Sequence, residues 1–193
     1  RQIVELVRGG ITARQIINRK GIENAFRLGT AIGGSTNLAL HIPAIAYEAH
    51  VPFDIGLFDT LSRTTPLIAR MNPAAPANVI DFYFSGGVPA VMAELLPLLH
   101  GEALTVTGAT LAANLAGVRS PDDEVIRTLA RPFSAAGGLA VLYGGLAPHS
   151  AVTKPAAIRP EMLTFRGPAR VFDSEEAANR AILEGALVPG EVV

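Results

Sequence analysis

The first half of the chain alternates between helical hydrophobic periodicity and breaks rich in glycine and proline. Apolar residues recur every three or four positions over 22–32 and 38–49, which predicts two amphipathic helices with a break between them. Shorter helices are predicted over 1–8, before a glycine pair, and after Thr12, which suits a capping position. Three more are predicted over 55–63, 88–100 and 109–117, and Asp54 is placed to cap the first of these.

Strand-like segments punctuate these helices and become more frequent toward the end of the chain. The strings "PLIARMNP" (66–73) and "EALTVTG" (102–108) predict strands, so the chain to about residue 118 is predicted to be α/β. A polar connection over 119–131 precedes three β-rich pieces, "GGLAVLYGG" (137–145), "SAVTKPAAI" (150–158) and "PARVF" (168–172). A helix over 174–184 follows, with Asp173 and Glu176 as its predicted capping box and Gly185 as its stop. The change of pattern predicts a domain boundary near residues 118–136.

Composition and charge narrow the class of protein. The 193 residues are 49% hydrophobic, which is enough for one large domain or two small ones. The net charge is -1 and the 16 Lys and Arg residues are scattered, so nucleic acid is not an expected partner. Gly, Pro, His or a charge interrupts every apolar run before about 18 residues, so no membrane span is expected. The absence of cysteine is typical of a reducing compartment and favours the cytoplasm.

The break between the first two long helices is the first candidate for binding chemistry. It reads "GGSTN", residues 33–37, directly before a helix. One interpretation is that Ser35 or Thr36 caps that helix after a tight turn. The other is that free backbone amides and the positive helix end face an anion. The string "SGGVPAVM" (85–92) has the same geometry, although Pro89 removes one amide.

The remaining polar residues give weaker indications. The Asp122–Asp123 pair lies in a polar connection and is interpreted as a solvated loop. Lys154 has a strand-like setting in which it suits an anionic substrate, although a lone lysine is ordinarily solvated. The four histidines have no metal-ligand spacing and are interpreted as surface or helix-end residues: His41, His50, His100 and His149.

Five strings in a fixed order together resemble one family. They are "NAFRLGTAIGGSTNLALHIPAIAYEA", "FDTLSRTTPLIARMNP", "SGGVPAVMAELLPLLHGEALTVTGATLAANLAG", "GGLAVLYGGLAPHSAVTKPAA" and "FRGPARVFDSEEAANRAILEG". The chain resembles the dihydroxy-acid and sugar-acid dehydratases, a family that includes phosphogluconate dehydratase. The resemblance covers nearly all 193 residues.

The resemblance implies a hydro-lyase that converts a 2,3-dihydroxy acid or sugar acid to the 2-keto acid. It also implies an iron–sulfur cluster acting as Lewis acid, a Mg²⁺ ion at the carboxylate end, and a serine alkoxide that takes the C2 proton. The implied fold is α/β: residues 1–130 are the later part of a three-layer α/β/α domain, and 131–193 begin a β-rich swivelling domain. The implied assembly is a homodimer or homotetramer.

The chain lacks the chemistry that the resemblance implies for the whole enzyme. It has no cysteine, so the three cluster ligands must lie outside it, and the magnesium ligands and catalytic serine match no segment here. The chain begins with Arg1, and we expect a middle piece of a longer protein that, in isolation, binds no cluster and has no activity. No catalytic or metal-binding residue is assigned within it. A free-standing, non-catalytic module that kept the fold remains the alternative.

The family's implied functional residues in this chain lie in the glycine-rich turn. Gly33, Gly34, Ser35, Thr36 and Asn37 are expected to line the cleft and face the substrate or the cluster. The family pattern G-N-L-A-P-x-G appears here as "GGLAPHS", with glycine at 145 and serine at 150. The string "TKPAA" (153–157) is closer to sugar-acid members than to the branched-chain enzyme.

Overall fold

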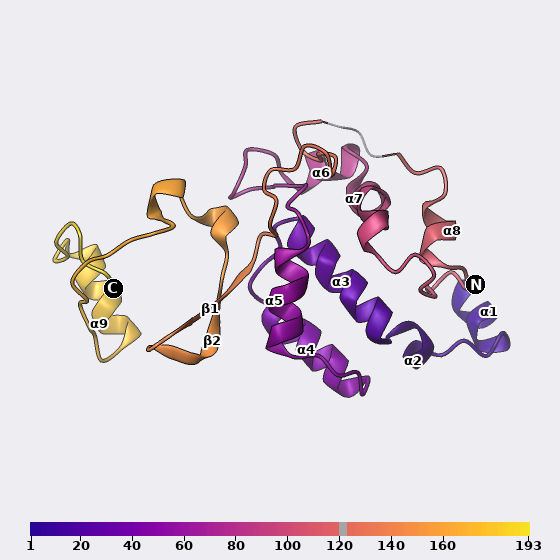
Figure 1. Cartoon of the computed structure of the whole chain (residues 1–193), viewed down its shortest axis with the longest axis horizontal. Helices are drawn as coiled ribbons and strands as arrows, with labels where there is room; N and C mark the ends of the chain where they lie inside the picture. Colours follow the sequence, from indigo (N-terminus) through magenta and orange to yellow (C-terminus); the bar gives the residue numbers. More distant parts are fainter. Residues whose placement is uncertain (120–122) are drawn as a thin grey trace. The chain divides into compact units, whose positions relative to one another are not determined.

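A computed structural model describes residues 1–119 and 123–193 of the chain, which form two compact units (Figure 1). The first unit is Arg1–Ala157 and the second is Ile158–Val193. Helices and a small sheet occur together, so the α/β class is confirmed in its broad sense of a mixed α and β fold. The predicted change of domain between residues 130 and 131 lies inside the first unit.

The described part of the first unit is mainly helical, and several of its helices begin at polar residues whose side chains cap them. Asp54 Oδ1 accepts a hydrogen bond from the Leu57 amide at 2.7 Å, which confirms that predicted cap. Asn18 caps the longest helix by accepting from the Gly21 amide at 3.1 Å. The α-helices are α1 (Gln2–Arg8), α2 (Ala13–Ile16), α3 (Arg19–Ala31), α4 (Leu38–Glu48), α5 (Ile55–Arg63), α6 (Val79–Phe84), α7 (Gly87–Leu95) and α8 (Leu111–Leu115), and the 3-10 helices are η1 (Leu96–Leu98) and η2 (Pro155–Ala157).

The sheet of the first unit is one antiparallel hairpin. Strands β1 (Ala140–Gly144) and β2 (Ala147–Thr153) pair with Val141 opposite Val152. Gly138 leads into β1 and lies against the end of α3, where a Cβ atom would come within 2.7 Å of Gly33 Cα. Only glycine allows this approach, which fixes the base of the hairpin beside the turn that follows α3.

The two strands predicted earlier in the chain are wrong. Residues 66–71 form an extended segment in which Leu67, Ile68 and Ala69 are buried, but it makes only single bridges, from Leu67 to Ser134 and from Ala69 to Ile126. The Ile68 and Ala69 amides instead donate to the Ala31 carbonyl at the end of α3. No described strand runs alongside this segment, so its apolar pattern reflects burial rather than a continuous ladder.

The alternation in 102–108 also has another cause, because the threonines close a tight turn. Thr105 Oγ1 lies 3.0 Å from Thr107 Oγ1 and donates to the Ala109 carbonyl at 2.9 Å. Gly108 has φ +82°, which reverses the chain there. Threonine hydroxyls therefore satisfy the backbone locally and leave a single bridge between Leu104 and Thr110.

Two apolar clusters hold the first unit together. In the first cluster Phe26 of α3 is fully buried, with its ring centroid 4.3 Å from that of Phe58 on α5. The second cluster joins α7 to the extended segment through Ile68, Val91 and Ile126. Helix α3 contributes to both clusters, so it is the central element on which the other helices pack.

The second unit contains α9 (Glu175–Leu183) and the 3-10 helix η3 (Pro160–Met162). The predicted capping role of Asp173 is wrong, because Ser174 Oγ accepts from the Ala177 amide at 3.2 Å and occupies the cap position. Gly185 follows the helix with φ +66°, as its predicted role as a stop requires. The predicted strand over 168–172 is also wrong, since the segment makes only a bridge from Ala169 to Val192.

Candidate functional site

The glycine-rich turn between α3 and α4 is closed against the end of α3. The Gly33 amide donates to Thr30 O at 3.2 Å and the Gly34 amide to Gly29 O at 2.8 Å. Gly33 has φ +62°, a backbone conformation that residues with a side chain rarely adopt. Both glycine amides are therefore occupied, and neither is available to bind an anion.

The first interpretation of this turn, in which Ser35 or Thr36 caps α4, is wrong. The first amides of α4 donate to the backbone carbonyls of residues 35–37, and no side chain caps the helix. Ser35 Oγ accepts only from the Asn37 amide, at 3.2 Å. The Thr36 hydroxyl and the Ser35 and Thr36 amides have no partner within residues 1–119 and 123–193. These exposed donors are free for other contacts.

A cavity of about 250 Å³ in the first unit adjoins this turn. Gly33 and Gly34 form one part of its wall, so the structure brings two of the five predicted residues into a pocket. Ser35, Thr36 and Asn37 are exposed but are not among the residues that line it. The wall comprises Ile32, Gly33, Gly34, Arg70, Met71, Asn72, Ala74, Asn78, Val79, Lys154 and Ala156.

Two cations line this cavity, which we call the cationic pocket. Lys154 follows β2 and Arg70 ends the extended buried segment. Neither side chain makes a hydrogen bond or an ion pair with any described residue, and the buried Arg70 Nε has no partner there. No Asp or Glu occurs among the described lining residues. An unpaired charge in a partly buried pocket is costly, so the arrangement favours an anionic ligand.

Carboxamides add neutral polar groups to the cationic pocket. The exposed Asn72 side chain has no hydrogen bond to a described residue. Asn78 Oδ1 caps α6 by accepting from the Ile80 amide at 2.7 Å, which leaves its NH₂ group for other partners. Asp81 is the nearby acid of this cap and accepts from the Asn78 amide at 2.7 Å. The pocket therefore offers positive charge together with amide donors.

The pocket shows what the sequence pattern revealed and what it missed. Lys154, which the sequence marked as suited to an anion, lies in the same cavity as the glycine turn. Arg70, Asn72 and Asn78 were not predicted. The signal for Arg70 was a single charge inside the apolar string "PLIARMNP", where an arginine needs a specific partner or ligand.

The histidines and acids form no metal site in the described residues. The structure shows no group of three or more His, Asp or Glu side chains there that suits a metal ion. Asp123 accepts from the Val125 and Ile126 amides at 2.7 Å, and Asp122 lies outside the described residues. In the second glycine pair, Gly87 is buried at the start of α7 and the Gly86 amide donates to the Tyr83 carbonyl at 3.1 Å.

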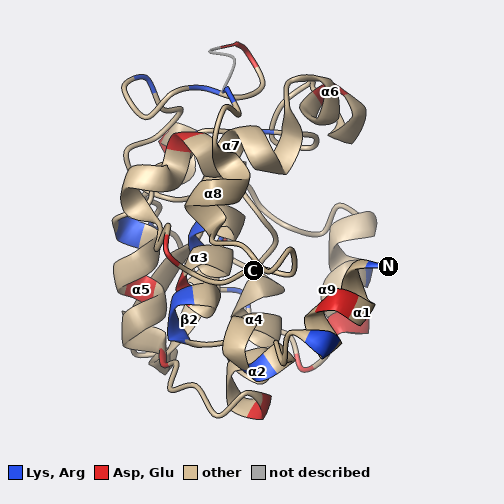
Figure 2. Cartoon of the chain, turned by 90° about the vertical axis from the view of Figure 1, so that its right-hand side faces the viewer, with Lys and Arg blue, Asp and Glu red and all other residues tan. Residues whose placement is uncertain are grey.

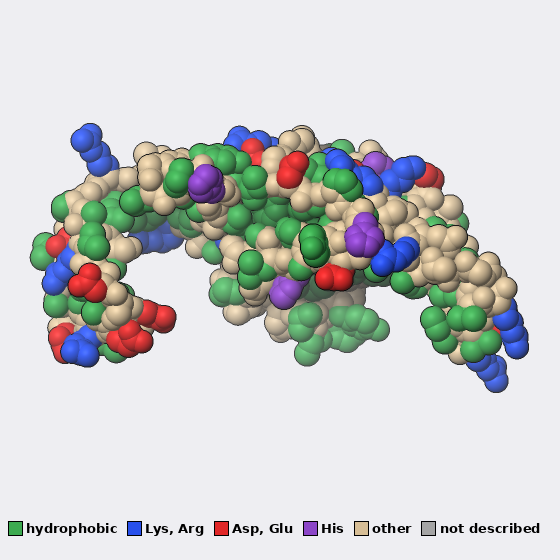
Figure 3. All heavy atoms as spheres, turned by 90° about the horizontal axis from the view of Figure 1, so that it is seen from below, with side chains coloured by type: hydrophobic (Ala, Val, Ile, Leu, Met, Phe, Trp, Pro, Cys, Tyr) green, Lys and Arg blue, Asp and Glu red, His purple; other side chains and the backbone are tan. Residues whose placement is uncertain are grey.

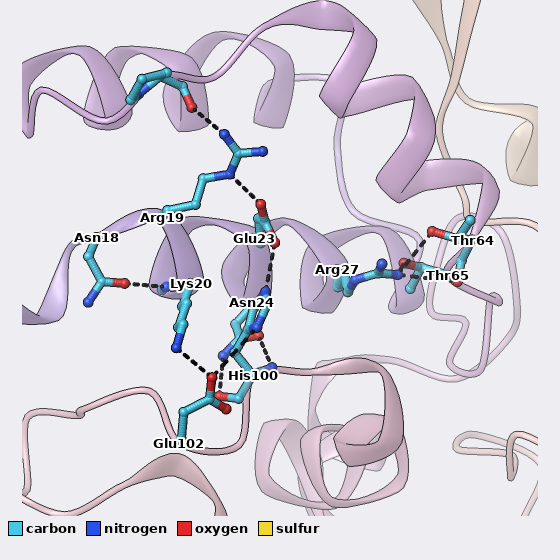
Figure 4. A network of polar contacts seen from close by, with 12 residues as sticks. Asn18, Arg19, Lys20, Glu23, Asn24, Arg27, Thr64, Thr65, His100 and Glu102 are labelled. Carbon is cyan, nitrogen blue, oxygen red and sulfur yellow. Dashed lines mark hydrogen bonds and ion pairs between the residues drawn. The ribbon is translucent and has the colours of Figure 1, made fainter.

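His100 takes part in a polar network on α3 (Figure 4). Its Nε2 lies 2.7 Å from Glu23 Oε2, and Glu23 also pairs with Arg19. Burial of Glu23 acts against its ionisation, but the hydrogen bonds from Arg19 and His100 outweigh burial and lower the pKa of this carboxyl. The network stabilises the contact between α3 and the segment after η1, so we assign it a role in stability rather than in binding.

A second, larger cavity of about 460 Å³ is almost entirely apolar. It lies between α2, α3, α4 and residues 103–111, with Leu28 and Ile45 in its wall.

Hydrophobic side chains also reach the surface in several groups on the face shown in Figure 3. Basic and acidic residues are scattered along the ribbon (Figure 2). None of the helices in the described residues has the length and apolar character to cross a membrane.

Comparison with known proteins identifies the family to which this chain belongs. The family model "Dihydroxy-acid/6-phosphogluconate dehydratase N-terminal" matches residues 1–114, and the corresponding C-terminal model matches residues 124–193. The chain therefore belongs to the dihydroxy-acid/6-phosphogluconate dehydratase family, and the resemblance seen in its sequence is confirmed.

Individual relatives are similar over the whole chain. Dihydroxy-acid dehydratases from Carboxydothermus hydrogenoformans and Syntrophobacter fumaroxidans are each 47% identical over 100% of this chain. The dihydroxy-acid dehydratase from Methanothrix thermoacetophila is 47% identical over 99% of it. The chain spans only 35% of the length of the first two relatives and 36% of the third.

Proposed function

We propose that the intact protein is a hydro-lyase that removes water from a 2,3-dihydroxy acid or a sugar acid and releases the 2-keto acid. The observation that carries this proposal is family membership across both matched segments. The cationic pocket supports it, because its two unpaired cations suit an acid substrate. The domain assignment, residues 1–130 and 131–193, and the three-layer and swivelling architecture of the whole enzyme are part of the same proposal.

The residues of this chain have binding and positioning roles in the proposed reaction. Arg70 and Lys154 attract an anionic group of the acid, and the Asn72 carboxamide offers hydrogen bonds to hydroxyl groups. The Ser35 and Thr36 amides, which have no partner among the described residues, add hydrogen-bond donors next to the glycine turn. Holding the anionic group and the hydroxyl groups of a flexible acid restricts its orientation before water is eliminated.

The iron–sulfur cluster and Mg²⁺ ion expected for the family do not fit the residues of this chain. The chain has no cysteine to supply thiolate ligands, and its described residues offer no acidic or histidine cluster for a metal. We place the ligands of both groups in the parts of the protein outside this chain. We likewise propose a cytoplasmic homodimer or homotetramer that acts on a small acid and binds neither nucleic acid nor membranes.

The proposed activity is tested on the full-length protein with a panel of branched dihydroxy acids and sugar acids. We expect 2-keto acid to form with at least one substrate class. No keto acid from any panel member, in a folded protein loaded with iron and magnesium, would contradict the proposal and favour a non-catalytic module. Iron and sulfide in the isolated 193-residue chain would contradict placing the cluster ligands elsewhere.

Alanine variants test the role of the turn in the full-length protein. Because neither hydroxyl caps α4, Ser35→Ala and Thr36→Ala should lower the free energy of unfolding by less than about 1 kcal/mol, the typical cost of losing a cap. We expect a clear loss of turnover in the same variants. Wild-type turnover and iron content in both variants would remove the turn from the proposed site.

A further inference from the structure

Phe133 contacts a charge of the cationic pocket without lining the pocket itself. Arg70 Cζ lies over the Phe133 ring, 4.0 Å from the ring centroid. A guanidinium within about 6 Å of an aromatic centroid is attracted to the face of the ring. Phe133 is half-buried and is not one of the described residues that line the cavity. The ring can therefore act on a ligand in the pocket only through Arg70.

Backbone hydrogen bonds hold the ring beside this arginine. The Phe133 amide donates to the Leu67 carbonyl at 2.8 Å, and the Leu67 amide donates to the Ser134 carbonyl at 2.9 Å. Leu67 is buried in the same extended segment that ends at Arg70. The ring and the guanidinium thus come from two segments that are joined through their backbones, and the fold sets their relative position.

Stacking on a ring orients the guanidinium and preserves its charge. The buried Arg70 Nε has no partner among the described residues, and no acid there pairs with this side chain. An acid in the place of Phe133 would neutralise the charge and occupy the donors, whereas an aromatic face leaves the donors in the guanidinium plane free. An arginine that is not held loses rotamer freedom when it binds a ligand, which lowers affinity. The contact with Phe133 removes part of that cost before binding.

We propose that Phe133 is a positioning residue, which holds the Arg70 guanidinium in the orientation that binds the anionic group of the acid. This role in the reaction rests on the proposed hydro-lyase function. It is specific to one of the two cations of the pocket, because Lys154 stacks on no aromatic ring of the described residues.

The kinetic test uses Phe133 variants of the full-length enzyme and measures 2-keto acid formation from the acid that the wild type converts best. Phe133→Leu and Phe133→Met keep an apolar side chain and remove the aromatic face. We expect each to raise KM by about fivefold and to keep kcat within about twofold, because Arg70 binds the anionic group in the ground state and the transition state alike. Phe133→Tyr keeps the aromatic face and should keep the wild-type KM. An unchanged KM in both non-aromatic variants, or an equal rise in Phe133→Tyr, would overturn the proposal.

A double-mutant cycle separates positioning of Arg70 from a general effect on the structure. In the Arg70→Met background, Phe133→Leu should leave KM unchanged, because the group that the ring orients is gone. In the Lys154→Met background, Phe133→Leu should still raise KM by about fivefold, because the ring does not contact that cation. An effect of equal size in both backgrounds would overturn the positioning role.

Arg127→Met is the matched control. Arg127 Cζ lies at the same 4.0 Å from the Phe133 centroid, but Arg127 is not among the lining residues of the pocket. The variant removes a stacked guanidinium and keeps the contact between Phe133 and Arg70, so we expect the wild-type KM. A rise in KM equal to that of Phe133→Leu would show that any loss of a contact around the ring has this effect, and would overturn the proposal.

A binding test needs no catalysis and uses inorganic sulfate as the probe. Millimolar sodium sulfate, compared with sodium chloride at equal ionic strength, should raise the melting temperature of the full-length protein and of Phe133→Tyr. The rise should be smaller in Phe133→Leu and absent in Arg70→Met. The same rise in Phe133→Leu and the wild type would overturn the positioning role. A rise that depends on Phe133, in a protein that converts no acid, would contradict the proposed hydro-lyase function and leave the positioning of Arg70 in place.

Discussion

Asn24 joins α3 to the chain after η1 through two hydrogen bonds, and its removal should be costly. The side chain has only 5% of its surface exposed. Its Oδ1 accepts from the His100 amide at 2.8 Å, and its Nδ2 donates to the His100 carbonyl at 3.1 Å (Figure 4). One carboxamide thus satisfies both backbone groups of a residue 76 positions away.

The substitution Asn24→Ala leaves the N–H and C=O groups of His100 without these partners. Each unsatisfied buried group costs about 1–3 kcal/mol, and partial access to water at His100 favours the lower part of that range. Alanine has a higher helix propensity than asparagine, which offsets about 0.5 kcal/mol of this loss of stability. We therefore expect the free energy of unfolding to fall by about 1.5–3.5 kcal/mol.

The assay is urea unfolding of the full-length protein followed by circular dichroism, together with hydrogen exchange at the His100 amide. His100→Ala is the control, because it keeps both backbone bonds and loses only the contacts of the partly exposed imidazole with Glu23 and Glu102. We expect the control to cost less than about 1 kcal/mol. Equal losses in the two variants, or unchanged exchange of the His100 amide in Asn24→Ala, would refute this account of the contact.

Three further predictions concern other contacts of the chain. The pKa of the Glu23 carboxyl is below its usual 4.5, so this carboxylate adds stability that is complete above pH 4.5 and is lost as the pH falls through the lower folded-state pKa. Glu23→Gln should therefore reduce the fall of melting temperature on acidification. The same dependence of melting temperature on pH in the variant and the wild type would contradict this. Ser174→Ala should destabilise α9 by about 1 kcal/mol and Asp173→Ala by less, measured by amide exchange at the start of the helix; the reverse order would restore the sequence-based assignment. Gly138→Ala should lower both melting temperature and turnover, because the added Cβ meets Gly33 Cα at 2.7 Å, and a wild-type melting temperature would show that this close approach is not needed.

Local signals in the sequence predicted most of the helices, although α6 over Val79–Phe84 was not predicted. Asp54 caps α5, and Gly185 ends α9, because both effects depend on a few neighbouring residues. The predicted strands in 66–73 and 102–108 are wrong, because a strand needs a partner that the segment itself does not specify. Ser174 displaces Asp173 as cap because two adjacent residues both suit the position, and tertiary structure decides between them.

The candidate site was only partly predictable for the same reason. The sequence marked the glycine turn and Lys154 separately, but they are about 120 positions apart, and only the fold places them around one cavity. Arg70 carried a local signal, a charge among buried apolar residues, but its stacking on Phe133 depends on a distant segment. The sequence therefore predicts residue types that suit an anion, and the packing of the hairpin against α3 brings them together.

The most direct measurement of the central claim is the effect of Lys154→Met on 2-keto acid formation by the full-length protein, compared with Lys20→Met. Lys154 lines the cationic pocket without a described partner, whereas Lys20 forms an exposed ion pair with Glu102 at 2.7 Å. We predict that Lys154→Met lowers kcat/KM for the acid substrate by about tenfold or more, because it loses a charged hydrogen bond, and that Lys20→Met keeps the wild-type value. Wild-type kcat/KM in Lys154→Met, or equal losses in both variants, would contradict the claim that this pocket binds the acid.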